Sequence, residues 1–136
     1  MNLHVPILLP LLLPACGGAQ DLDANSVVEQ DSNAATFVLS VRHTPAVLPL
    51  NAEFEVRFQL LDREGRALDV ELEDVSVDAD MPEHGHGMTV HPSVRREGTE
   101  YVAGPMLFHM SGRWEVYFDV RRGAVTERAQ IAWTLD

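Results

Sequence analysis

The sequence is poor in cysteine and in basic residues, and both shortages exclude certain kinds of chemistry. Its 136 residues include one cysteine, Cys16, so no intramolecular disulfide can form and a folded domain must rest on its hydrophobic core. Twenty-one acidic residues stand against ten basic ones, which gives a formal net charge of −11. Nucleic acids and anionic lipid headgroups would be repelled by such a surface, so neither is an expected partner.

Recognisable catalytic motifs are also missing. The sequence contains no glycine-rich phosphate loop after a strand, no Gly-x-Ser-x-Gly and no His-Glu-x-x-His. Ser93 and Ser111 lie in no triad context, and the alternating Asp78 and Asp80 are typical of a solvated strand face. We therefore expect a protein that is not an enzyme.

The first residues predict export. Residues 3–13 form an apolar run that is too short and too interrupted by proline for a membrane-spanning helix. The run ends in Pro14-Ala15-Cys16, where a small residue directly before a cysteine resembles a bacterial lipobox. We predict a signal peptide over residues 1–15 and a lipidated Cys16 that anchors the protein in the cell envelope, facing the periplasm or the exterior. Pro14 departs from the lipobox pattern, so a plain secretory signal is the alternative.

The remaining sequence divides into a linker and one domain. Residues 16–35 are small and polar, which is typical of a flexible tether, and residues 36–136 suffice for one small domain. Apolar and polar residues alternate with period two, most clearly at residues 54–60, 75–81 and 114–120. No segment shows helical periodicity. The pattern predicts an all-β fold, an immunoglobulin-like antiparallel β-sandwich of about seven short strands.

Two short blocks in this domain resemble a known family. Residues 81–86 carry a Met-Pro-x-His-x-His pattern, and residues 110–114 carry Met-x-Gly-x-Trp. Together with the strand pattern of residues 54–66, these blocks are similar to the YtkA-like domain, to which FixH-type domains are related. The resemblance covers roughly residues 36–135. It implies a small β-sandwich that is exported or membrane-anchored, and some relatives are associated with copper handling and oxidase assembly.

Soft metal ligands gather in the same region. Residues 81–110 hold four of the six histidines and every methionine except the initiator. Thioether sulfur selects soft cations such as Cu(I), and imidazole accepts several metals. A closed zinc site is less expected without thiolates. The candidate ligands are His84, His86, Met88, Met81, His91, His109 and Met110.

Packing is the alternative interpretation of these residues. Met81 continues the inward face of residues 75–81, and Met106, Phe108 and Met110 would share one face of a strand. Two functions follow. The chain is either a lipid-anchored accessory protein that binds or delivers Cu(I) as its metal partner, or a non-catalytic interaction or structural module of an envelope assembly. A pH sensor built on the clustered histidines is a third alternative.

Overall fold

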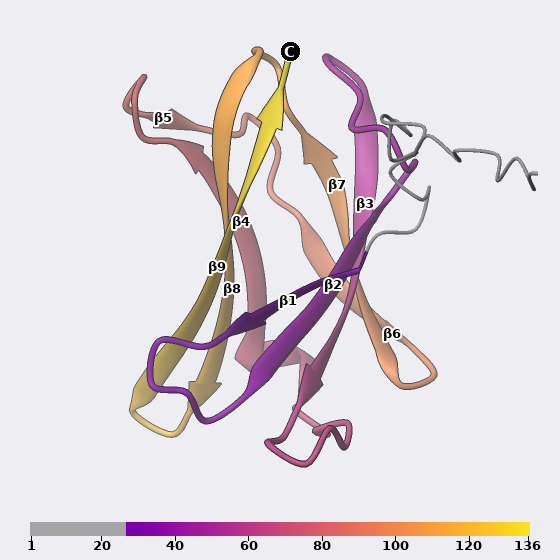
Figure 1. The fold of residues 1–136 in the computed structure, drawn as a ribbon, viewed down its shortest axis with the longest axis vertical. Coiled ribbons are helices and arrows are strands. Elements are labelled where there is room, and N and C mark those ends of the chain that lie inside the picture. The colour runs from indigo at the N-terminus through magenta and orange to yellow at the C-terminus, as the bar shows by residue number, and fades with distance from the viewer. Residues whose placement is uncertain (1–26) are drawn as a thin grey trace, which may run out of the picture.

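Two antiparallel sheets pack face to face in the part of the chain that the structure describes, residues 27–136 of a computed structural model (Figure 1). This architecture confirms the predicted all-β antiparallel sandwich. The predicted signal peptide and Cys16 lie outside the described residues. The strands are β1 (Val28–Asp31), β2 (Val38–Thr44), β3 (Glu53–Leu61), β4 (Val75–Met81), β5 (His86–Gly87), β6 (Ser93–Glu97), β7 (Glu100–Leu107), β8 (Gly112–Arg122) and β9 (Val125–Leu135).

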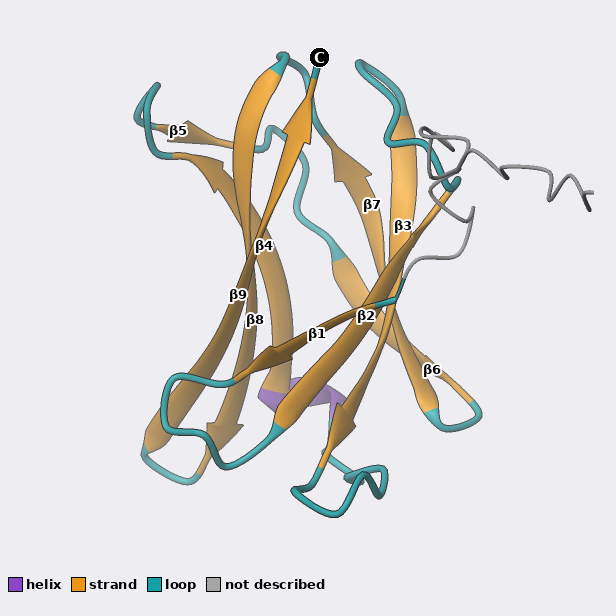
Figure 2. Ribbon diagram, viewed as in Figure 1, coloured by secondary structure: helices purple, strands orange, loops and turns teal. Residues whose placement is uncertain are grey.

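The nine strands of residues 27–136, rather than the predicted seven or so, divide into sheets of five and four. One sheet has the order β1-β2-β3-β7-β6 and the other the order β5-β4-β8-β9. The helical structure of residues 27–136 is one short 3-10 helix, Leu72–Asp74, which precedes β4 (Figure 2). No helix within residues 27–136 is long and apolar enough to cross a membrane.

The core forms where the alternating apolar residues of the two sheets meet. Phe54, Val56, Phe58 and Leu60 of β3 are all buried, while the residues between them are half-buried on the other face. The Phe58 ring stacks on Tyr101 at a centroid distance of 5.4 Å and meets Phe118 of the opposite sheet edge-on at 5.0 Å. Burying side chains of this size stabilises a fold by about 1.5–3 kcal/mol each.

The folded region starts before the predicted boundary at residue 36. Strand β1 pairs with Val38–Val41 of β2, and Ser32 is buried. The Glu127 carboxylate of β9 accepts hydrogen bonds from the Ser32 hydroxyl and from the Thr36 hydroxyl and N–H. Residues 28–35 therefore belong to the domain, and that part of the predicted tether is wrong. All four side chains of β1 are exposed, so its pairing rests on the backbone and leaves no alternating pattern in the sequence.

One hairpin and the ends of two other strands meet at one end of the sandwich. The β4–β5 hairpin, the start of β8 and the end of β9 lie together there, at the top of Figure 1, near the connection between β2 and β3. Cross-strand pairs tie this end together, with Trp114 of β8 opposite Trp133 of β9. Four of the sequence-predicted ligands, His84, His86, His109 and Met110, belong to this end of the molecule.

Candidate metal-binding site

The β4–β5 hairpin carries the first two candidate ligands. The backbone N–H groups of His84 and Gly85 both donate to the Met81 carbonyl, at 3.0 and 2.9 Å, which closes a tight turn after β4. Gly85 has a φ of +69°, in the left-handed region that favours glycine. His86 follows in β5, opposite Met81. The turn brings the two imidazoles to a centroid distance of 5.8 Å, with His84 exposed and His86 half-buried.

The connection between β7 and β8 brings a third imidazole to the same place. Phe108 is fully buried and stacks on Trp114 at 4.5 Å, and the Trp114 Nε1–H donates to the Met110 carbonyl at 3.0 Å. These two contacts hold His109 between them. Its ring centroid lies 5.0 Å from that of His86. Since β4 and β8 are neighbours in one sheet, two loops far apart in sequence meet here.

Three imidazoles therefore form a row beside one indole. The row runs from the exposed His84 through His86 to His109. The Trp114 ring lies 5.4 Å from His109 and 6.2 Å from His86, edge-on to both. Sequence periodicity assigns Trp114 to the core only, and its place in the Met-x-Gly-x-Trp block is the one signal that links it to the histidines.

His109 carries a polar atom that lacks a partner. Its Nδ1 is buried and has no hydrogen-bond partner among the described residues. A buried polar group without a partner costs about 1–3 kcal/mol. In the neighbouring ring, His86 Nδ1 makes only a long contact of 3.4 Å with the Gly87 carbonyl. Neutral imidazole nitrogen is a common metal ligand, so an ion at this place would satisfy the unpaired atom.

The methionines differ in how far they can reach an ion. Met81 is 1% exposed and Met88 9% exposed, and both belong to the hydrophobic core. The Met88 sulfur already accepts the Leu107 N–H at 3.5 Å. Met110 is 37% exposed and follows His109 directly in the chain. Of the three, Met110 is the one whose side chain is not part of the hydrophobic core.

The remaining predicted ligand lies apart. His91 is exposed in the connection between β5 and β6, and no ring contact within residues 27–136 joins it to the other three histidines. Over the same residues, no group of three or more His, Cys, Asp or Glu side chains is arranged to hold a metal ion. The imidazoles make a row and not a cage. The neighbouring pair of imidazoles suits a soft ion of low coordination number better than zinc.

Acidic side chains lie beside the row. Asp80 of β4 stands directly opposite Glu115 of β8. A hollow of about 320 Å³ next to them is lined by Asp80, His86 and Tyr117, among others. Burial raises the pKa of Tyr117, and the negative charges of Glu115 and Asp80 raise it further. Cations lie here as well: Arg113 pairs with Glu115 at 3.3 Å, and the Arg128 guanidinium lies 4.3 Å from the centre of the Tyr117 ring and lowers the Tyr117 pKa. The carboxylates beside His86 are therefore partly balanced by positive charge.

Comparison with known proteins identifies the family of this chain. The sequence model of the YtkA-like family matches residues 29–119, about two thirds of the chain. The chain therefore belongs to the YtkA-like family, and the resemblance seen in its sequence is confirmed. The match begins within β1, in agreement with a folded region that starts before residue 36. Neither the curated proteins nor the solved structures include a significant match.

Proposed function

We propose that this protein is an exported, lipid-anchored and non-catalytic accessory protein that binds Cu(I) through His86 and His109 and buffers or delivers the ion outside the cytoplasm. The observation that carries the proposal is the 5.0 Å distance between the centroids of these two rings, together with the buried His109 Nδ1, which has no hydrogen-bond partner within residues 27–136. Membership of the YtkA-like family supports an accessory, extracytoplasmic role. The lipid anchor at Cys16 comes from the sequence and would be the only link to a membrane.

The ring separations fit a shared ion. Metal–imidazole bonds are about 2.0–2.1 Å long, so two imidazoles on one ion have ring centroids up to roughly 6 Å apart. The His86–His109 separation of 5.0 Å and the His84–His86 separation of 5.8 Å both fall within that limit. The backbone therefore already places His86 and His109 within range of one shared ion.

The gradient of exposure along the row suggests how an ion is exchanged. His84 is exposed, His86 is half-buried, and His109 holds the buried nitrogen. An ion could bind His84 and His86 first and then His86 and His109, with Met110 as a third ligand. A set of two or three ligands leaves room for a receiving protein to add its own ligand before the ion departs. That receiver would be a partner in the cell envelope.

A competition titration tests this proposal. The full chain with Cys16→Ser lacks the lipidation site and its one thiol, so it is titrated with Cu(I) against a chromogenic chelator under reducing conditions. We expect one-to-one binding. The double variant His86→Ala/His109→Ala should lose affinity by about 100-fold or more, because changes even in the groups that support metal ligands cost 10–100-fold. His91→Ala is the matched control and should bind like the parent.

The second candidate function is a non-catalytic interaction module. It is favoured by the burial of Met81 and Met88 in the core, and by the lack of a three-ligand His, Cys, Asp or Glu group over residues 27–136. Failure of the parent protein to compete for Cu(I) would leave this module as the working function. The histidine row would then serve as a polar surface.

A further inference from the structure

Strand β9 is an edge of its sheet, and only half of that edge is covered. At Arg128 the loop after β1 takes the place of a neighbouring strand. The Asn33 N–H donates to the Arg128 carbonyl at 2.7 Å, and the Arg128 N–H donates to Asn33 Oδ1 at 3.1 Å. Glu127, bonded to Ser32 and Thr36, fixes this loop. The first half of β9 is thus closed to any further strand.

The second half of the same edge is open. In an antiparallel strand the N–H and C=O of alternate residues point to the same side. Because those of Arg128 point away from β8, so do those of Gln130, Ala132 and Thr134, which are all exposed. Within residues 27–136, no backbone hydrogen bond outside the sheet ladders reaches these three residues. Unpaired edge groups of this kind are a template for another strand.

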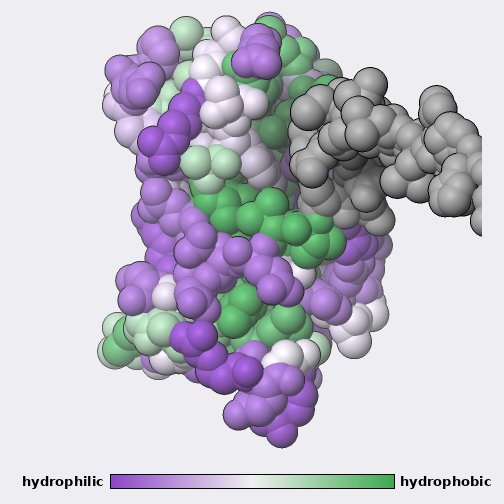
Figure 3. All heavy atoms as spheres, in the orientation of Figure 1, coloured by the Kyte–Doolittle hydropathy of each residue, from purple (hydrophilic) through white to green (hydrophobic). Residues whose placement is uncertain are grey.

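A neighbouring edge in the other sheet is open at the same height. Strand β1 covers β2 only along Val38–Val41, so within residues 27–136 no strand pairs with residues 42–44 on that side. Among residues 27–136, β1 is thus the strand that crosses the side of the sandwich between β2 and β9, and it pairs with only the first part of β2 (Figure 1). Apolar surface gathers across the middle of this face, with hydrophilic side chains on both sides (Figure 3).

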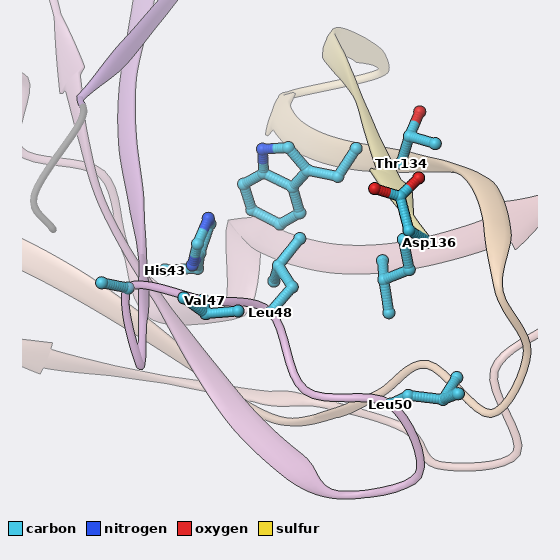
Figure 4. A pocket seen from close by; sticks show the side chains of 9 residues that line it. His43, Val47, Leu48, Leu50, Thr134 and Asp136 are labelled. Atoms are coloured by element: carbon cyan, nitrogen blue, oxygen red, sulfur yellow. The ribbon is translucent and has the colours of Figure 1, made fainter. Parts of the chain in front are cut away.

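An apolar groove lies at the part of β2 that β1 does not cover. It has a volume of about 580 Å³, and the residues that matter for its chemistry are His43, Val47, Leu48, Leu50, Trp133 and Asp136. Figure 4 shows the side chains of Val47, Leu48 and Leu50 along one strip of chain, and across from them Thr134 of β9 and Asp136, the residue after β9. Val47 is 81% exposed and Leu50 46% exposed. The His43 ring meets Trp133 edge-on at 5.0 Å and joins the two walls.

The shape and the charge together define the occupant. An open strand edge beside an apolar groove fits an extended segment whose alternate side chains enter the groove while the others face solvent. The groove contains Asp136 and neither Lys nor Arg, and the chain as a whole carries a net charge of −11. A second copy of the chain would bring the same negative charge. A basic segment is attracted.

We propose that this corner of the sandwich binds an extended segment of another protein in which apolar residues alternate with Arg or Lys. The segment adds as a strand to Gln130–Thr134 of β9, and its apolar side chains occupy the groove. The ring centroids of Trp133 and Phe108 are 6.4 Å apart, and Phe108 in turn stacks on Trp114, the indole beside His109. A bound segment therefore lies near the histidine row, but its binding requires no metal.

The test uses two synthetic nine-residue peptides, one with valine alternating with arginine and one with valine alternating with glutamate. Each is titrated into the ¹⁵N-labelled full chain carrying Cys16→Ser. We expect saturable binding of the basic peptide only, with amide shifts at Gln130, Ala132 and Thr134 and a change in Trp133 fluorescence. Shifts confined to the acidic face around Asp80 would show simple charge attraction and overturn the proposal.

Variants separate strand addition from other modes of binding. Ala132→Pro removes one outward N–H at an edge, where proline is tolerated, and should weaken binding about tenfold or more. Ala132→Val keeps that N–H and is its matched control. Val47→Ser, at an 81% exposed site, should weaken binding without affecting the fold. His86→Ala/His109→Ala should bind the peptide unchanged. Equal binding by Ala132→Pro and Ala132→Val, or a chain that dimerises through this edge in sedimentation, would contradict the proposal.

Discussion

Replacing Glu127 by glutamine should loosen the attachment of residues 32–36 to β9. The Glu127 side chain belongs to a residue that is 7% exposed, and it accepts the Thr36 hydroxyl at 2.5 Å, the Thr36 N–H at 3.1 Å and the Ser32 hydroxyl. Glutamine keeps one acceptor oxygen and places an NH₂ where the other oxygen accepted. Hydrogen bonds to a charged group contribute about 1.5–3 kcal/mol and neutral ones about 0.5–1.5 kcal/mol. We expect a loss of about 1–3 kcal/mol in unfolding free energy, a fall in Tm of about 4–15 °C.

The same contacts predict how stability depends on pH. Burial raises the pKa of Glu127, but hydrogen bonds from Ser32 and Thr36 lower it, and the net effect is a pKa below the ordinary value. A carboxyl with a lowered folded-state pKa stabilises the fold fully above its unfolded-state pKa of about 4.3. This stability is lost as the pH falls through the lower, folded-state value. The difference between the parent and Glu127→Gln should therefore shrink below about pH 4.

Urea unfolding followed by tryptophan fluorescence measures both effects. The parent and Glu127→Gln are compared at pH 7 and at steps from pH 5 to pH 3, with Glu29→Gln as the matched control. Glu29 is an exposed glutamate in β1, so its variant should unfold like the parent. An equal urea midpoint for the parent and Glu127→Gln at pH 7 would refute the role of these hydrogen bonds. So would a difference that stays constant down to pH 3.

Two further substitutions test the packing of the domain. Gly112→Ala should destabilise it by about 1–3 kcal/mol, because Gly112 has a φ of +121° and a Cβ there would lie 2.9 Å from Met81 Cε. Gly98→Ala should cost less in a thermal melt, because a φ of +63° is accessible to alanine and its Cβ would meet nothing within 4 Å; equal losses would contradict this reasoning. Tyr101→Phe removes the hydroxyl that donates to the Val70 carbonyl and accepts the Val70 N–H, both at 2.9 Å. The substitution should lower the free energy of unfolding in urea by about 1–2 kcal/mol. An unchanged urea midpoint would show that the hydroxyl does not hold the chain at Val70 in place.

Strands with one buried face could be predicted from the sequence, and strands without one could not. The alternation at residues 75–81 and 114–120 marks β4 and most of β8, because burial on one face imposes period two. In β1 all four side chains are exposed, and in β6 only Val94 is even half-buried. Such edge strands are held by backbone pairing, which leaves no trace in the order of apolar residues.

The candidate site divides in the same way between local and distant features. His84 and His86 meet because one turn joins them, so their proximity could be predicted from spacing and the glycine between them. The approach of His109 depends on β4 and β8 being neighbours, which no motif states. The burial of Met88, and the absence of a hydrogen-bond partner for His109 Nδ1 among residues 27–136, follow from three-dimensional packing alone.

The central claim is that His86 and His109 hold Cu(I), and X-ray absorption on the one-to-one complex of the Cys16→Ser chain tests it most directly. The account predicts two nitrogen ligands at about 2.0 Å and one sulfur at about 2.3 Å, close to the distances for zinc. The nitrogen signal should disappear in His86→Ala/His109→Ala, and the sulfur signal in Met110→Leu. A copper spectrum that the double histidine variant leaves unchanged, or a parent chain that forms no Cu(I) complex, would contradict the account.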